Sequence, residues 1–70
     1  MTDIKELVEK IKEFGYSQAN ITGYNKNPDG SENVLAEVKD ESGSFKTCAF
    51  KFDTEGKPIG SICFDKINNS

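Results

Sequence analysis

The side chains that could carry chemistry in this 70-residue chain are two cysteines, twelve carboxylates and nine lysines. The chain has no histidine, so it lacks the commonest general base and the usual partner of cysteine in zinc sites and nucleophilic pairs. It also has no arginine, so it offers no bidentate clamp for a phosphate or a carboxylate. Its glycines form no phosphate-binding pattern. We therefore expect a protein that is not an enzyme and that holds no cofactor.

The carboxylates also fail to form a recognisable metal or acid-base site. Asp40 and Glu41, like Asp53 and Glu55, lie in short segments rich in turn-forming residues. A calcium loop needs alternating oxygen ligands followed by a distal glutamate, and neither segment has that spacing. Paired carboxylates in acid-base catalysis need a pocket, which so small a domain rarely encloses. The sequence therefore predicts no metal ligand and no catalytic residue.

The first predicted element is a helix over residues 3–14. Its apolar residues recur at the three- and four-residue spacing that forms one stripe on a helix: Ile4, Leu7, Val8, Ile11 and Phe14. Thr2 or Asp3 can cap the start of this helix, and Gly15 supplies a residue that readily turns left-handed at its end. Because so short a helix is marginal by itself, its stripe must pack on another element.

Three tetrapeptides of one form divide the rest of the chain. Each begins with Asn or Asp and ends with Gly, and successive starts lie thirteen residues apart: Asn27-Pro28-Asp29-Gly30, Asp40-Glu41-Ser42-Gly43 and Asp53-Thr54-Glu55-Gly56. This form is typical of a type I turn closed by a glycine with positive φ. The turns predict hairpins that join strands over residues 18–26, 32–39, 45–52 and 58–65, followed by a frayed tail at 68–70.

The register set by these turns places most of the strand apolar residues on one face of the sheet. These residues are Val34, Ala36, Val38, Cys48, Phe50, Phe52, Ile62 and Phe64, with Thr22 and Tyr24 aligned beside them. The helix stripe covers this face. We therefore expect an α+β fold over residues 1–70, a single domain in which one N-terminal helix packs on a four-stranded antiparallel meander sheet (α-β-β-β-β) in two layers.

The same register predicts the state of the two cysteines. It points Cys48 into the core and Cys63 to the opposite face, where the two sulfurs are too far apart to bond. We therefore predict two free thiols. In one alternative, a longer last loop brings the cysteines opposite each other, but it turns Ile62 and Phe64 toward solvent and is disfavoured for that reason.

The opposite face of the sheet is half apolar, and it is the predicted partner-binding surface. Its residues are Ile21, Leu35, Phe45, Ala49 and Ile59, with Glu37 and Lys39 at the margin. An apolar patch on a polar chain of net charge −3 is typical of a protein interface. We expect a small acidic protein-binding module, an inhibitor or regulator of a larger partner protein of the kind that phages and mobile elements encode.

Two other functions fit the same composition. A homo-oligomeric structural domain, such as a homodimer, would associate through the outer sheet face around a twofold axis. An acidic nucleic-acid mimic would use the excess of twelve carboxylates over nine lysines. The acidic balance disfavours direct nucleic-acid binding. The sequence shows neither a signal peptide nor a transmembrane segment, so we expect a cytoplasmic protein with no membrane partner.

A helix followed by an antiparallel meander resembles small inhibitor-like and PepSY-like domains. Residues 50–59, Phe50-Lys51-Phe52-Asp53-Thr54-Glu55-Gly56-Lys57-Pro58-Ile59, have the strand, acidic turn, glycine and strand that such domains show. The resemblance covers the topology and this one hairpin. It implies the α+β fold and assigns no functional residue, because a shared fold does not establish a function.

Overall fold

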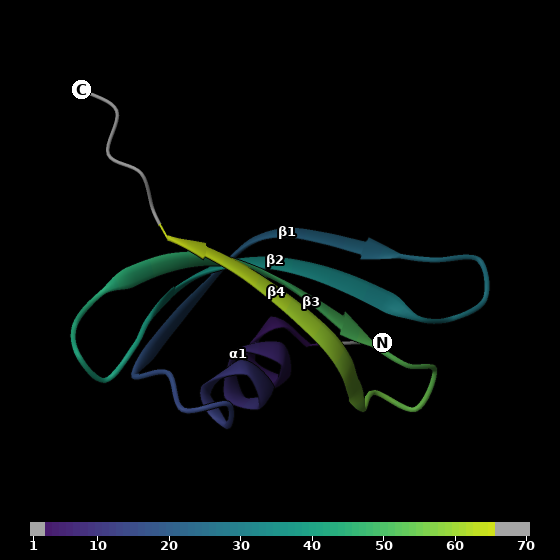
Figure 1. Cartoon of the computed structure of the whole chain (residues 1–70). Helices are drawn as coiled ribbons and strands as arrows, with labels where there is room; N and C mark the ends of the chain where they lie inside the picture. The colour runs from purple at the N-terminus through teal and green to yellow at the C-terminus, as the bar shows by residue number, and fades with distance from the viewer. Residues whose placement is uncertain (1–2, 66–70) are drawn as a thin grey trace.

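The computed structural model describes residues 3–65, and within them it contains one helix and one sheet. The elements are α1 (Ile4–Lys12), β1 (Gln18–Lys26), β2 (Glu32–Lys39), β3 (Phe45–Phe52) and β4 (Pro58–Asp65). The strands pair in the order β1-β2-β3-β4, and the sheet arches over α1 (Figure 1). The predicted two-layer α-β-β-β-β meander is confirmed, and so are its strand bounds. The tail predicted at 68–70 lies outside the described residues.

The helix α1 forms where the sequence provides both a start and an end. The Asp3 carboxylate accepts a hydrogen bond from the Lys5 backbone N–H at 3.1 Å, which satisfies one of the free donors of the first turn. After the helix, Gly15 adopts a φ of +107°. In the middle of the predicted stripe Leu7 and Ile11 are buried, whereas Ile4 and Phe14 at its ends are exposed. The helix therefore packs through its central turns.

The core lies between α1 and the inner face of the sheet. Its buried residues are Leu7, Ile11, Val34, Ala36, Val38, Cys48, Phe50 and Phe52. The strands β2 and β3 contribute alternate residues because successive side chains of a strand point to opposite faces. Every β2 and β3 residue in this core was predicted to face the helix.

All three turns have the predicted form. Gly30, Gly43 and Gly56 adopt φ values of +96°, +91° and +85°. Each glycine donates its N–H to the carbonyl three residues earlier at 2.9 to 3.0 Å, which closes the turn. Because turn geometry fixes the register of the strands that follow, β2 and β3 pair as predicted, with Ala36 opposite Cys48.

Hydrogen bonds within the turns keep two aspartates in the ionised form. The Ser42 hydroxyl donates to Asp40 at 2.6 Å and is the main cause that lowers the pKa of that carboxyl. The Lys57 backbone N–H donates to Asp53 at 2.8 Å and lowers the pKa of Asp53 in the same way. Both carboxylates therefore stabilise their turns most when they are charged.

The pairing of β4 with β3 departs from the predicted register by one residue. Phe52 pairs with Pro58, but the next pair is Lys51 with Gly60. Ile59 is left as an extra residue on β4, which is a β-bulge. Proline has no N–H to donate to the ladder, so a regular pairing is hardest to keep at this position.

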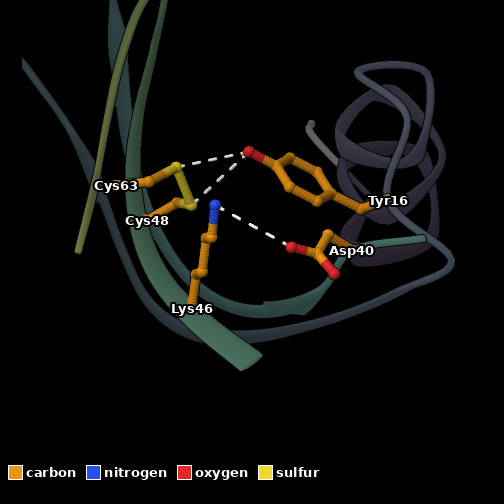
Figure 2. Close-up of a disulfide and its surroundings, with 5 residues drawn as sticks. All are labelled: Tyr16, Asp40, Lys46, Cys48 and Cys63. Carbon is orange, nitrogen blue, oxygen red and sulfur yellow. Dashed lines mark hydrogen bonds and ion pairs between the residues drawn. A yellow bond between two sulfur atoms is a disulfide. The ribbon is translucent and has the colours of Figure 1, made fainter. Parts of the chain in front are cut away.

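The bulge reverses the faces of β4. Cys63 lies directly opposite Cys48 and forms a disulfide with it, so the prediction of two free thiols is wrong (Figure 2). Ile62 and Phe64 are 63% and 64% exposed, so their prediction as core residues is also wrong. Both errors have one cause, because the prediction continued the register of the turn through Pro58 as if the strand were regular.

A second bulge changes the direction in which the side chains of the N-terminal half of β1 point. The register shifts at Thr22, so Ile21 rather than Thr22 pairs with Ala36. Gly23 follows the shift, and a glycine inside a strand often marks such a bulge. Ile21 and Ala19 pack against the core, so the prediction that Ile21 faces outward is wrong.

We predict that Ile11→Ala lowers the free energy of unfolding by about 2 to 5 kcal/mol, because it leaves a cavity in the core. The matched change Ile4→Ala should cost less than about 1 kcal/mol, since Ile4 is 50% exposed on the same helix. Urea denaturation followed by circular dichroism measures both values. Equal losses would show that the central stripe does not pack on the sheet.

We predict that Asp53→Asn weakens the pH dependence of stability in acid. The pKa of Asp53 is lower in the folded chain than its unfolded value of about 3.9, so its contribution is present above that pH. The contribution is lost as the pH falls through the folded value, because the unfolded state then binds more protons. Asparagine keeps an accepting oxygen but does not titrate.

Urea midpoints measured between about pH 5 and pH 2 should therefore fall less for Asp53→Asn than for the wild type. The control is Glu55→Gln, which lies in the same turn and donates only its backbone N–H to Asp53. A parallel fall for all three proteins would mean that the Asp53 turn does not contribute to acid sensitivity.

Candidate binding face

The outer face of the sheet, on the side away from α1, carries a continuous row of apolar side chains. Leu35 of β2 pairs with Ala49 of β3, and Ala49 pairs with Ile62 of β4. Phe64 lies two residues further along β4, opposite Thr47. Phe45 begins β3 on the same face. We call these five apolar residues the outer patch: Leu35, Phe45, Ala49, Ile62 and Phe64.

The large side chains of the outer patch are open to solvent. Their exposed fractions are 48% for Leu35, 52% for Phe45, 63% for Ile62 and 64% for Phe64. Single exposed apolar residues are common on protein surfaces, but a contiguous set across three strands is a feature of interaction sites. The patch is therefore the strongest candidate for a binding site in the described part of the chain.

An open groove borders the patch on its β1 side and at the end near Gly60. It has a volume of about 580 Å³, and Leu35, Ala49 and Ile62 line it. Glycines widen this groove because they project no side chain. A Cβ added at Gly23 would lie 3.3 Å from the Leu35 side chain, so Leu35 rests directly over the β1 backbone.

Charged residues occur at the border of the outer patch. Glu37 and Lys39 follow Leu35 at alternate positions of β2, and Lys51 lies on the same face of β3. The Lys39 ammonium lies 5.5 Å from the centroid of the Phe45 ring, a cation–π contact. The border holds one carboxylate and two ammonium groups, so the acidic excess of the chain lies elsewhere.

The structure brings five of the seven predicted site residues together on the outer face: Leu35, Glu37, Lys39, Phe45 and Ala49. Ile21 lies on the inner face instead. Ile59 lies at the β4 bulge, where it is 57% exposed. The sequence reasoning missed Ile62 and Phe64, and the signal that could have found them is the proline directly after the last turn.

Other kinds of site receive no support from the described residues. Among residues 3–65, no three Cys, Asp or Glu side chains gather as a metal-binding group. In the same range, α1 is too short to cross a membrane. Comparison with known proteins yields no matching family model, no matching curated protein and no matching solved structure. The outer patch therefore has to be interpreted from its own geometry.

We predict that Leu35→Lys and Ile62→Lys each change the free energy of unfolding by less than about 1 kcal/mol, because both side chains face solvent. Urea denaturation measures the change. Ile62 is the sharper test, since the unbulged register would bury it and a lysine there would then unfold the chain. Such unfolding would contradict the register described above.

Proposed function

We propose that this chain is a non-enzymatic binding module that docks on a larger protein through the outer patch. The observation that carries the proposal is the exposed row of Leu35, Ala49 and Ile62, extended by Phe45 and Phe64. A sheet with one covered face and one bare apolar face can gain a further layer by binding. A partner would supply that layer.

The energetics define what the partner must provide. Burying a large apolar side chain fully is worth roughly 1.5 to 3 kcal/mol, and these side chains are about half exposed, so each has roughly half of that left to gain. Association itself costs at least about 4 kcal/mol, so the outer patch alone gives weak binding. Additional contacts are available at β4, an edge strand whose outer backbone groups can pair with a strand of the partner.

The charges indicate the chemistry of the partner. The charges nearest the outer patch are of both signs, with Glu37 and Lys39 on β2 and Lys51 on β3. A matching protein would therefore carry an apolar surface bordered by charges of both signs, with carboxylates opposite Lys39 and Lys51. Complementary charge speeds the encounter of two proteins and selects the orientation in which they dock.

The size of the chain fits an inhibitor or regulator that occupies the surface of another protein. A standard interface covers about 800 Å² of each partner, which is about a sixth of the 4922 Å² surface of this chain. One face of the sheet can supply an area of that order. A small domain that binds in this way acts by blocking or holding the surface that it covers.

The test compares the two outer-patch variants with a matched variant elsewhere. Leu35→Lys and Ile62→Lys put a charge into the patch, whereas Ile4→Lys removes an isoleucine that is 50% exposed on α1. The immobilised wild type captures its partner from an extract of the source cells, and the captured protein is then purified. Isothermal titration calorimetry measures the affinity of each variant for it.

We expect each outer-patch variant to bind at least about tenfold more weakly, because a central apolar contact typically costs more than 1 kcal/mol when it is lost. Ile4→Lys should bind like the wild type. Equal affinities for all variants would overturn the proposal. If high salt abolishes binding while the outer-patch variants bind as tightly as the wild type, the result would point to a nucleic-acid mimic instead.

Light scattering on the purified chain tests whether a second copy of the chain, rather than another protein, covers the outer patch. Glu37 and the two lysines at the border have opposite signs, so two outer faces could also meet each other. We expect a monomer. A dimer that Leu35→Lys and Ile62→Lys dissociate would assign the outer patch to self-association and overturn the proposal.

A further inference from the structure

The edge strand β4 has a single side-chain anchor in the core. From Pro58 to Phe64, every residue except Cys63 is exposed. Cys63 is partly buried, packs against the core and is bonded to the fully buried Cys48. The rest of the attachment is the backbone ladder to β3, which the bulge at Ile59 interrupts. The disulfide is therefore the main side-chain link between β4 and the rest of the domain.

The opposite edge strand, β1, is attached in a different way. Ala19 and Ile21 pack against the core from its inner face. The helix α1 also packs beside β1. Hydrophobic contacts therefore hold β1, and they do not depend on the redox state of a cysteine. Loss of the disulfide would affect the two edges of the sheet unequally.

The two cysteines of the disulfide differ in burial. Cys48 is fully buried and Cys63 is partly exposed, so Cys63 is the one of the two residues that a reagent from solvent can approach. The Tyr16 hydroxyl donates a hydrogen bond to Cys63 Sγ at 3.3 Å and lies 3.8 Å from Cys48 Sγ (Figure 2). One hydroxyl therefore lies close to both sulfurs of the disulfide.

We propose that the Cys48–Cys63 disulfide is a reduction site for dithiols, and that its cleavage releases β4 from the sheet. A thiolate of the dithiol attacks Cys63 Sγ, forms a mixed disulfide and displaces the Cys48 thiolate. The Tyr16 hydroxyl lies close enough to donate to that thiolate before it takes up a proton.

The second thiol of the reductant completes the reaction. It attacks the mixed disulfide and displaces Cys63, so the reductant leaves as its own cyclic disulfide. Two electrons and two protons pass from the dithiol to the cysteines, which become thiols. No other reactant is required.

Release of β4 follows from the loss of its anchor. The disulfide closes a loop between residues 15 apart in sequence, and a loop of this length favours the closed state by on the order of a hundredfold. Without it, β4 can open locally while the core between α1 and β1–β3 stays folded. Opening removes Ile62 and Phe64 from the outer patch and leaves the β3 backbone unpaired.

Hydrogen–deuterium exchange on the chain alone tests this proposal, and it needs no partner, so it stands apart from the proposed function. The wild type is compared with and without dithiothreitol, a dithiol. Mass spectrometry confirms the gain of the two hydrogens. We expect the amides of β4 to exchange on the order of a hundredfold faster after reduction. The amides of β2, at the centre of the sheet, should keep their protection.

A double variant, Cys48→Ala/Cys63→Ala, provides the matched control. It should show fast exchange in β4 without any reductant and should not respond to dithiothreitol. Unchanged protection of β4 in the reduced wild type or in the double variant would overturn the proposal. Loss of protection throughout the chain would also overturn it, because the disulfide would then hold the whole fold rather than one strand. A disulfide that dithiothreitol cannot reduce in the folded chain would exclude a reduction site.

Discussion

Strand register is the constraint on which the rest of this structure depends. Side chains alternate between the faces of a sheet, so a shift of one residue moves a whole strand's side chains to the opposite face. In β4 this shift pairs Cys63 with Cys48 and turns Ile62 and Phe64 outward. The disulfide, the absence of Ile62 and Phe64 from the core and their place in the outer patch are therefore three results of one bulge.

The fold could be predicted from local chemistry, whereas the faces of the edge strands could not. The turns at Gly30, Gly43 and Gly56 are encoded in four residues each, and the turn at Gly43 sets the regular pairing of β2 with β3. Bulges at Thr22 and after Pro58 arise within the strands, and the spacing of turns does not reveal them. Five of the predicted site residues lie on the outer face because all five belong to β2 or β3, which pair in a regular register.

The opposed cysteines explain why a register that exposes two large apolar side chains is tolerated. The bulge leaves Ile62 and Phe64 exposed, but it also places Cys63 directly opposite Cys48. A disulfide needs such a directly opposed partner, and it stabilises the folded chain by constraining the unfolded one. The expectation that the apolar residues of every strand face the helix therefore fails in the strand that is linked covalently to the core.

Under the proposed release of β4, the redox state of the cellular compartment decides whether Ile62 and Phe64 remain part of the outer patch. Disulfides persist in oxidising compartments and are rare in the cytosol, where thiol systems keep cysteines reduced. A cytoplasmic location, as expected from the sequence, would therefore favour the reduced chain. Under the proposed release of β4, the same sequence would present an outer face with β4 or one without it. The thiol–disulfide redox potential of the compartment would select between the two.

Binding and reduction would then oppose each other by thermodynamic linkage. A partner that covers Ile62 and Phe64 holds β4 against β3, so the free energy by which it stabilises the closed state rises with the logarithm of its concentration once this exceeds the dissociation constant. The coupling is reciprocal, so the factor by which reduction weakens binding equals the factor by which binding disfavours reduction. Because both effects act through the position of one strand, a bound partner would protect the disulfide most strongly where β4 itself forms part of the interface.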